Sequence, residues 1–160
     1  MGITIDGAGT ITGLDADGIS AQPVFPGNVL QVVRATDSAN RSTTSTSFVD
    51  AGISVTITPT RSDSAIMLIW SFVGRHASGG FLVTQITDSD NNAVSGAGTN
   101  SFGTFTASNN PKYTENTIGY STPATILPIT YKGRFRTSTA TSSILNEENV
   151  GQLYAIEVAA

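Results

Sequence analysis

The chain has 160 residues, and its eight Lys and Arg against twelve Asp and Glu leave a formal net charge of −4. The absence of Cys excludes a disulfide framework, a Cys-ligated zinc site, a thiol nucleophile and an iron–sulfur cluster. A pI near 4.7 argues against a nucleic-acid binder with a basic stripe, and the length suits one domain with a core of its own.

Residues 1–27 are predicted to form an N-terminal arm rather than part of the core. Gly is frequent in this segment, and two prolines interrupt any regular element at its end. The first 20 residues carry three acidic side chains and no basic one: Asp6, Asp15 and Asp17. Short strands are predicted at Ile3 to Ile5 and at Ile11, with pairing to another chain as one option. The N-terminus lacks the basic and apolar regions of a signal peptide, so we expect a soluble protein made in the cytoplasm.

Period-two patterns predict the strands of a single domain over residues 28–160. In residues 53–58, Ile and Val alternate with Ser and Thr, which suits a half-buried strand. The predicted strands are 30–33, 53–58, 66–73, 81–87, 116–120, 129–137 and 153–158. Residues 95–112 are rich in Gly, Ser and Asn, and are predicted to form a long loop or a weak hairpin.

The segment 66–73 differs from the other strands because it is apolar on both faces. Such a strand is central in its sheet, or another subunit covers one of its faces. It is too short to span a bilayer. No window has the apolar spacing of a helix, so the predicted fold class is all-β, a single β-sandwich or jelly roll with an extended N-terminal arm. The chain has 23 Thr, 18 Ser and few charged residues. A small sandwich with so few charges exposes sheet edges and apolar faces, which oligomerisation commonly covers.

Two motifs invite a chemical interpretation, and a structural one is preferred for both. His76 is the only His and is predicted to lie in a surface loop at 74–80; a Ser-His-Asp hydrolase is the alternative, but no G-x-S-x-G motif accompanies it. Residues 88–92 begin like a calcium-binding EF-hand loop. Ala93 and Thr99 stand where that loop needs Gly and Glu, so a polar turn is predicted instead.

Three basic side chains lie on one face of the strand 129–137: Lys132, Arg134 and Arg136. They are interpreted as a docking strip for an acidic partner or an anionic glycan, with a solvated sheet face as the alternative. Glu147 and Glu148 are predicted to lie in a solvated loop, since no second acidic cluster completes a glycosidase pair. No catalytic residue, cofactor or metal site is predicted, and the chain is expected not to be an enzyme.

Three stretches resemble structural proteins of marine and cyanobacterial phages. Residues 3–14, ITIDGAGTITGL, resemble the TI-x-G-x-GTITG opening of those proteins. Residues 29–33 and 45–59, VLQVV and STSFVDAGISVTITP, resemble their VLQVV and TSTSFVDTGLSVTITP core, and residues 152–158, QLYAIEV, resemble their closing L-x-AIE strand. Members of this family are often labelled tail-fibre-like and are similar to trimeric jelly rolls.

This resemblance implies a virion surface protein that assembles with itself, as a homotrimer, and with the major capsid protein or another virion protein. Because the chain has no repetitive shaft, we favour a capsid decoration (cement) protein whose arm contacts the shell. The alternative is a short tail fibre or receptor-binding tip that contacts a host surface glycan, for which Phe102, Phe105 and Tyr113 are candidate stacking residues. A surface depolymerase is a third, disfavoured class. No nucleic-acid or membrane partner is expected. The predicted partner-binding residues are Ile3, Ile5, Asp6, Asp15, Asp17, Phe25, Lys132, Arg134 and Arg136.

Overall fold

The computed structural model describes residues 4–5, 11–12, 25–76, 80–103, 112–139 and 142–160. Within these residues the chain forms strands and no helix, so none of this part could cross a membrane as a helix. In chain order the strands are β1 (Thr4–Ile5), β2 (Ile11–Thr12), β3 (Val29–Asp37), β4 (Arg41–Thr43), β5 (Val49–Ile57), β6 (Ala65–His76), β7 (Phe81–Asp88), β8 (Asn100–Gly103), β9 (Tyr113–Ser121), β10 (Ile129–Thr137), β11 (Ser143–Leu145) and β12 (Gly151–Val158).

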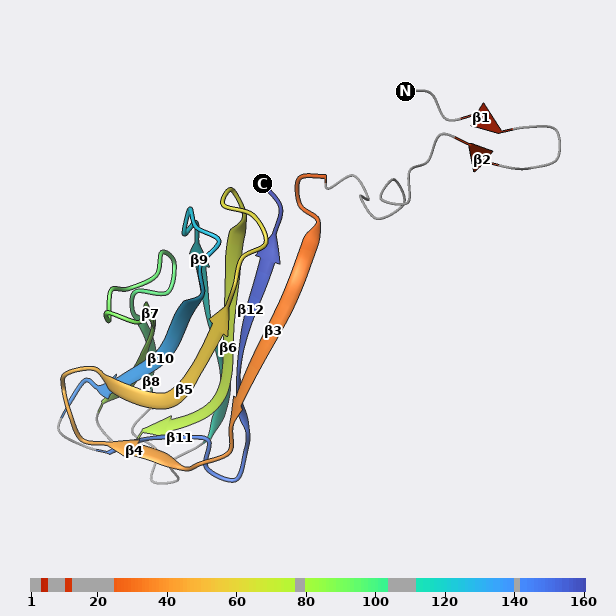
Figure 1. Cartoon of the computed structure of the whole chain (residues 1–160). Helices are drawn as coiled ribbons and strands as arrows, with labels where there is room; N and C mark the ends of the chain where they lie inside the picture. The colour runs from red at the N-terminus through yellow and green to blue at the C-terminus, as the bar shows by residue number, and fades with distance from the viewer. Residues whose placement is uncertain (1–3, 6–10, 13–24, 77–79, 104–111, 140–141) are drawn as a thin grey trace.

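Strands β3 to β12 form two antiparallel sheets that face each other (Figure 1). The four-stranded sheet has the order β5-β10-β7-β8. In the six-stranded sheet β3, β12, β6 and β9 lie side by side, and β11 and β4 extend the sheet at the far end of β6. The order β3-β12-β6-β9 over β5-β10-β7-β8 is that of a jelly roll with two Greek keys. The predicted β-sandwich of jelly-roll type is therefore confirmed.

The two strands with the clearest sequence patterns take the places that those patterns predict. In β5 the side chains of Ala51, Ile53, Val55 and Ile57 are buried, and the residues between them are exposed. β6 is central, because it pairs with β12 on one edge and with β9 on the other. The alternation in β5 thus follows from burial of one face. In β6 the inward side chains are buried, whereas the outward ones, such as Met67 and Ile69, are apolar and only half-buried.

The core between the sheets is built around the indole ring of Trp70, which is fully buried. Gly133 of β10 faces this ring, and a Cβ atom at position 133 would lie 2.9 Å from Ile53 Cγ2 and 3.0 Å from Trp70 Cε2 and Cζ2. The register between β10 and β5 shifts at the same point, between Lys132 and Arg134. Gly133 therefore makes room for the largest side chain of the core.

Several strands are longer than predicted, and two were not predicted. β3 runs from Val29 to Asp37 instead of ending at residue 33, and β9 begins at Tyr113 instead of residue 116. β4 and β11 have three residues each and pair with each other, while β11 also pairs with the end of β6. Three residues contain too little periodicity to identify a strand, so tertiary pairing decides these elements.

The segment that follows β7 closes one open side of the sandwich. Val94 N donates to Ile86 O at 3.0 Å and Tyr120 N donates to Ser95 O at 2.9 Å, so this segment connects β7 of one sheet with β9 of the other. Farther along, β8 pairs with β7, so residues 100–103 of the segment predicted as a loop or weak hairpin at 95–112 form a strand whose partner lies outside that segment. Phe105 lies outside the described residues.

The N-terminal arm is described only at β1, β2 and from Phe25 onward. β1 and β2 pair with each other, with Thr4 opposite Thr12 and Ile5 opposite Ile11, and not with another strand of the described chain. Gly27 N donates to Ala159 O at 2.8 Å, so the arm joins the sandwich beside the C-terminus (Figure 1). Four predicted partner-binding residues lie outside the described residues: Ile3, Asp6, Asp15 and Asp17.

Candidate functional site

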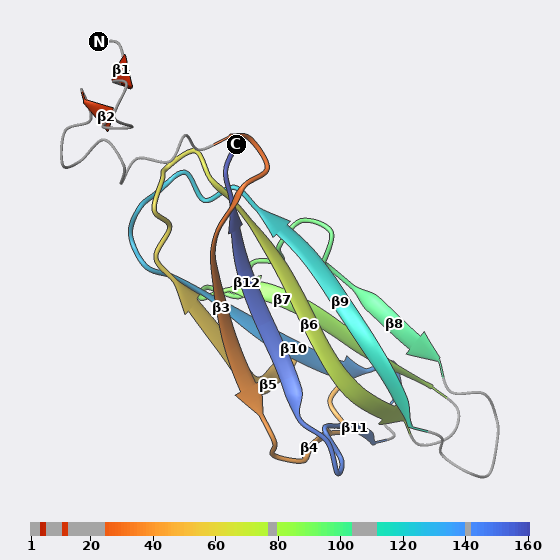
Figure 2. The ribbon, with the colours of Figure 1, turned by 90° about the vertical axis from the view of Figure 1, so that its right-hand side faces the viewer.

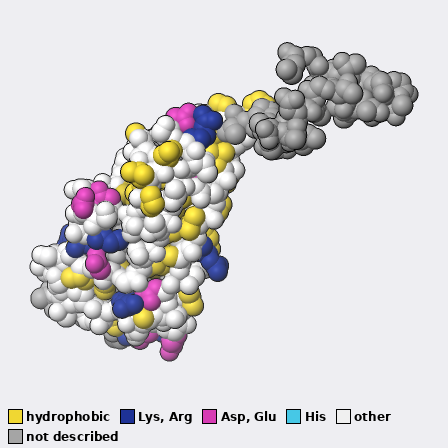
Figure 3. Space-filling view, in the orientation of Figure 1, with side chains coloured by type: hydrophobic (Ala, Val, Ile, Leu, Met, Phe, Trp, Pro, Cys, Tyr) yellow, Lys and Arg dark blue, Asp and Glu magenta, His cyan; other side chains and the backbone are white. Residues whose placement is uncertain are grey.

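The three predicted basic residues share one face of β10, and each has an intramolecular partner. Arg134 donates to the Phe48 carbonyl at 2.8 Å and forms an ion pair with Asp50 at 3.2 Å. The Arg136 guanidinium lies 5.2 Å from the centre of the Phe48 ring. On the face visible in Figure 3, positive and negative side chains lie in small mixed groups and form no strip of one sign. Docking of an acidic partner on this row would therefore compete with existing contacts.

The third basic residue, Lys132, holds the turn that follows β7. Lys132 Nζ donates to Asn91 Oδ1 at 2.8 Å and to the Ser89 carbonyl at 3.1 Å. The Asp88 carboxylate accepts the backbone N–H groups of Asp90 and Asn92, both at 2.9 Å. These contacts confirm the predicted polar turn, because the Asp88 carboxylate, the Ser89 carbonyl and the Asn91 amide oxygen accept hydrogen bonds within it. Within the described residues, no group of three or more acidic or imidazole side chains could hold a metal ion.

His76 lies in the core, so the predicted surface loop is wrong at this residue. His76 is the last residue of β6 and is fully buried. Its Nε2 atom lies 2.7 Å from the hydroxyl of Thr137 on the opposite sheet. The Thr137 hydroxyl donates to the Thr139 carbonyl and therefore accepts from His76, which favours the Nε2–H tautomer. The imidazole connects the two sheets, and burial removes it from any substrate.

The pair Glu147–Glu148 takes part in a cluster of charges at the end of the sandwich opposite the C-terminus. Glu147 accepts a hydrogen bond from Arg75 at 2.9 Å, and Lys112 lies 2.7 Å from Glu148. The Arg75 hydrogen bond lowers the pKa of the Glu147 carboxyl despite some desolvation. The two carboxylates are therefore partners of basic residues on β6 and before β9, and the described cluster has no pair of opposed acids for hydrolysis.

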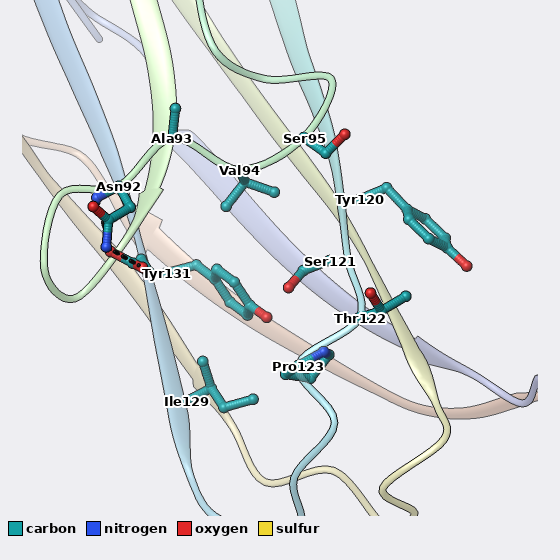
Figure 4. Close-up of a pocket in the computed structure, with 11 residues that line it drawn as sticks. Asn92, Ala93, Val94, Ser95, Tyr120, Ser121, Thr122, Pro123, Ile129 and Tyr131 are labelled. Carbon is teal, nitrogen blue, oxygen red and sulfur yellow. Dashed lines mark hydrogen bonds between the residues drawn. The ribbon is translucent and has the colours of Figure 1, made fainter.

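A hollow of about 410 Å³ opens between the segment 93–95 and the end of β9 (Figure 4). Val94, Ile129 and Pro123 give it apolar walls, and Ser121 and Thr122 add hydroxyl groups. Its lining is uncharged except for Asp88, whose oxygens accept hydrogen bonds from its own turn. A small uncharged molecule with hydroxyl groups fits this lining best.

Tyr131 is the distinctive residue of this hollow. Its ring points from β10 toward Ser121 and Pro123 (Figure 4), and the residue is only 1% exposed. No hydrogen bond of regular geometry reaches its hydroxyl within the described part of the chain, although Ser121 lies close to it. Burial raises the pKa of this hydroxyl most strongly, the Ser121 hydroxyl lowers it, and the negative charge of Asp88 raises it. The group is thus a neutral donor that a bound hydroxyl or a water molecule can satisfy.

A buried carboxylate at the end of β12 was not predicted from sequence. Glu157 is fully buried and accepts hydrogen bonds from Gln31 Nε2 at 2.6 Å, Thr60 N at 2.8 Å and Thr60 Oγ1 at 2.9 Å. Burial alone would raise the pKa of Glu157, but these hydrogen bonds outweigh it and the pKa is lowered. The acidic residue of the closing AIE motif thus anchors the turn after β5 to β3 and β12.

The outer side of the six-stranded sheet, where β3, β12, β6 and β9 lie side by side in Figure 2, carries many apolar side chains. The strand register aligns its side chains in rows that cross β3, β12, β6 and β9. The first row is Val32, Ile156, Met67 and Tyr120, and the second is Arg34, Tyr154, Ile69 and Ile118. The next row is polar: Thr36, Gln152, Ser71 and Asn116. We call the first two rows the apolar face.

Apolar residues at outward positions of two strands indicate this face in the sequence. The strand 66–73 is apolar at every position but Ser71, and covering by another subunit was one of its two predicted explanations. β12 shows a weaker form of the same signal, because Tyr154, Ile156 and Val158 point away from the core. The rows themselves were not predictable, since they depend on the register among four strands that are distant in sequence.

Comparison with known proteins adds limited information. The sequence matches no model of a known protein family and no curated protein. Part of the fold is similar to a chain of the T13 IBDV viral particle, with 15% identity, a TM-score of 0.44, and coverage of 84% of this chain and 36% of that chain. A chain of the infectious bursal disease virus VP2 subviral particle gives 15% identity, a TM-score of 0.33, and coverage of 81% and 37%. This chain spans little more than a third of either protein, and so distant a likeness does not extend to function.

Proposed function

We propose that this chain is a structural protein of the virion, and specifically a decoration protein of a phage head that acts as a trimer. The observation that carries the proposal is the apolar face, which exposes hydrophobic side chains across four strands of a rigid jelly roll. Val32, Ile118 and Tyr120 are 56%, 51% and 53% exposed. A surface of this kind marks a contact with another protein, and the described residues hold no comparable catalytic grouping.

The resemblance to phage structural proteins supports the same proposal. The stretches of residues 29–33, 45–59 and 152–158 coincide with β3, β5 and β12. β3 and β12 are neighbours in the six-stranded sheet, and β5 is the edge strand of the four-stranded sheet. In the proposed mechanism the arm 1–27, with three acidic residues, contacts the shell and the sandwich faces outward. Phe25, which is 61% exposed where the arm meets the sandwich, belongs to this contact. A subunit that binds the assembled shell but not free capsid protein stabilises the shell by mass action.

Deletion of the arm tests this proposal. The full chain and a variant without residues 1–27 are mixed with undecorated phage heads, and bound protein is measured after sedimentation of the heads. We expect the full chain to bind in hundreds of copies per head and the truncated chain not to bind. Binding of the truncated chain would refute the role of the arm, and a copy number of a few dozen or fewer would refute decoration.

A receptor-binding tip is the second candidate function, and the hollow around Tyr131 favours it. Its buried hydroxyl and the neighbouring Ser121 and Thr122 suit a hydroxyl-bearing ligand such as a surface glycan. Titration calorimetry with polysaccharide from the host surface tests this function, with Tyr131→Phe as the matched variant. Equal binding by both proteins would exclude the hollow as the glycan site, and release of shortened polysaccharide would indicate a depolymerase.

A further inference from the structure

The apolar face has the size and layout of the centre of a protein interface. Four strands about 4.8 Å apart and two rows about 7 Å apart, with their side chains, give it an area of roughly 300 Å². The polar row of Thr36, Gln152, Ser71 and Asn116 borders the face on one side. A stable interface buries about 800 Å² on each partner, with an apolar centre inside a polar rim. The apolar face is therefore large enough to be such a centre, but not a whole interface.

An exposed apolar residue at the start of β3 extends the apolar face toward the C-terminus. Val29 begins β3, is 60% exposed and pairs with Val158 of β12. Ile126 and Leu127 are also exposed, at 59% and 68%, but they lie in the connection that leads to β10 of the opposite sheet and are not counted in this face. Val29 therefore adds to the apolar centre, and the polar row supplies part of the rim that a stable contact needs.

Charge restricts the kind of partner that can cover the apolar face. Arg34 is the one charged side chain in the three rows, and it lies on the edge strand β3, where it stays at the rim. A strongly charged partner such as a nucleic acid would have only Arg34 as an oppositely charged group on this surface. The matching surface is flat, apolar and nearly uncharged.

The same chain offers such a matching surface. The outer side of the four-stranded sheet does not match, because it carries Lys132, Arg134 and Arg136 together with the paired hydroxyls of Thr56 and Thr130. The apolar face matches itself, because apolar rows can pack on apolar rows while both copies keep Arg34 at the rim. We propose that the apolar face is the self-association surface: it is turned toward the axis of the trimer, where each copy of this chain packs against the same face of its two neighbours.

This inference rests on the proposed function for its expectation that the chain assembles with itself, and it adds the surface involved. It also separates two contacts, because the arm is left for the shell while the apolar face joins the copies. A closed oligomer around one axis then presents several arms at once, which strengthens binding to a repetitive shell through multivalency.

The experiment compares two arginine substitutions at residues of the same type and similar exposure. Val32 lies in the apolar face and is 56% exposed, whereas Val150 lies in the turn before β12 and is 52% exposed. Analytical ultracentrifugation of the full chain, of Val32→Arg and of Val150→Arg follows their mass at up to roughly 100 µM, where even a micromolar contact is saturated. Thermal unfolding confirms that the variants fold, and Ile118→Arg provides a second substitution in the same face.

We expect the full chain and Val150→Arg to be oligomeric and Val32→Arg and Ile118→Arg to dissociate, with a dissociation constant raised at least about 30-fold, as for one interface hot spot. A monomeric full chain, or folded Val32→Arg and Ile118→Arg proteins that stay oligomeric, would overturn the inference. Assembly only after addition of capsid protein would also overturn it, because a different partner then covers the face. Since no shells are present in the ultracentrifuge, failure here leaves the shell-binding test of decoration unaffected.

Discussion

The buried carboxylate of Glu157 permits the most specific test of how this jelly roll is held together. In Glu157→Gln the side chain keeps its shape, but one acceptor oxygen becomes an amide donor that faces Gln31 Nε2 or the N–H and hydroxyl of Thr60. A hydrogen bond to a charged group contributes about 1.5–3 kcal/mol, and an unpaired buried group adds to that loss. We expect the free energy of unfolding to fall by about 2–4 kcal/mol.

Urea unfolding measures this change, and the protein contains its own probe. Trp70 is the only Trp and is fully buried, so its fluorescence reports the opening of the core. For a domain of this size, about 2–4 kcal/mol corresponds to a fall in melting temperature of about 5–15 °C. Glu148→Gln is the matched control, because the Glu148 side chain is 80% exposed and its loss should leave stability nearly unchanged.

The pH dependence of unfolding provides the decisive result for Glu157. Its pKa in the folded protein is lowered from an ordinary value of 4.5, so the unfolded chain binds the proton more tightly. The carboxylate therefore stabilises the fold above pH 4.5, and this contribution is lost as the pH falls through the lower folded value. The stability difference between the natural chain and Glu157→Gln should shrink over that range. A difference that stays constant from pH 7 to pH 3 would refute the role given to the ionised carboxylate.

Three further predictions concern the core and the polar turn. Gly133→Ala should cost about 1–3 kcal/mol in urea unfolding, because the new methyl group meets the ring of Trp70 at 3.0 Å; unchanged stability would contradict this packing. Thr84→Val should lower the free energy of unfolding by about 1–3 kcal/mol, because it removes the buried 2.7 Å hydrogen bond with Thr117 across the sheets. Adding Thr117→Val should recover part of that loss, since the double variant leaves no unpaired hydroxyl of this pair; purely additive effects would argue against a coupled pair. Calorimetry with Ca²⁺ should show no heat and no melting shift for the 88–92 turn, since its oxygens accept internal hydrogen bonds, and a saturable heat would overturn that explanation.

The polar turn and the basic residues of β10 show which features of a site can be predicted from local sequence and which depend on tertiary contacts. The turn at 88–92 was predicted because Asp and Asn satisfy the backbone of their own segment. Its link to Lys132 was not, because that residue reaches the turn only through the pairing of β10 with β7. The basic residues were correctly placed on one face of β10, whereas the partners of the two arginines, Phe48 and Asp50, come from the start of the neighbouring strand β5 and the residue before it. Whether the row binds a partner remains a prediction.

The sequence by itself determined the all-β class and the inward face of β5 and β10, because alternation is a local consequence of burial. For β6 it left two explanations, a central position or cover by another subunit, and the pairing with β12 and β9 decided the central position. Only the tertiary structure decided the three-residue strands β4 and β11, and the burial of His76 against Thr137. It also decided the apolar rows that run across β3, β12, β6 and β9. These features share one physical reason: each depends on which distant strands lie side by side and in what register, and a jelly roll brings together strands from opposite ends of the chain.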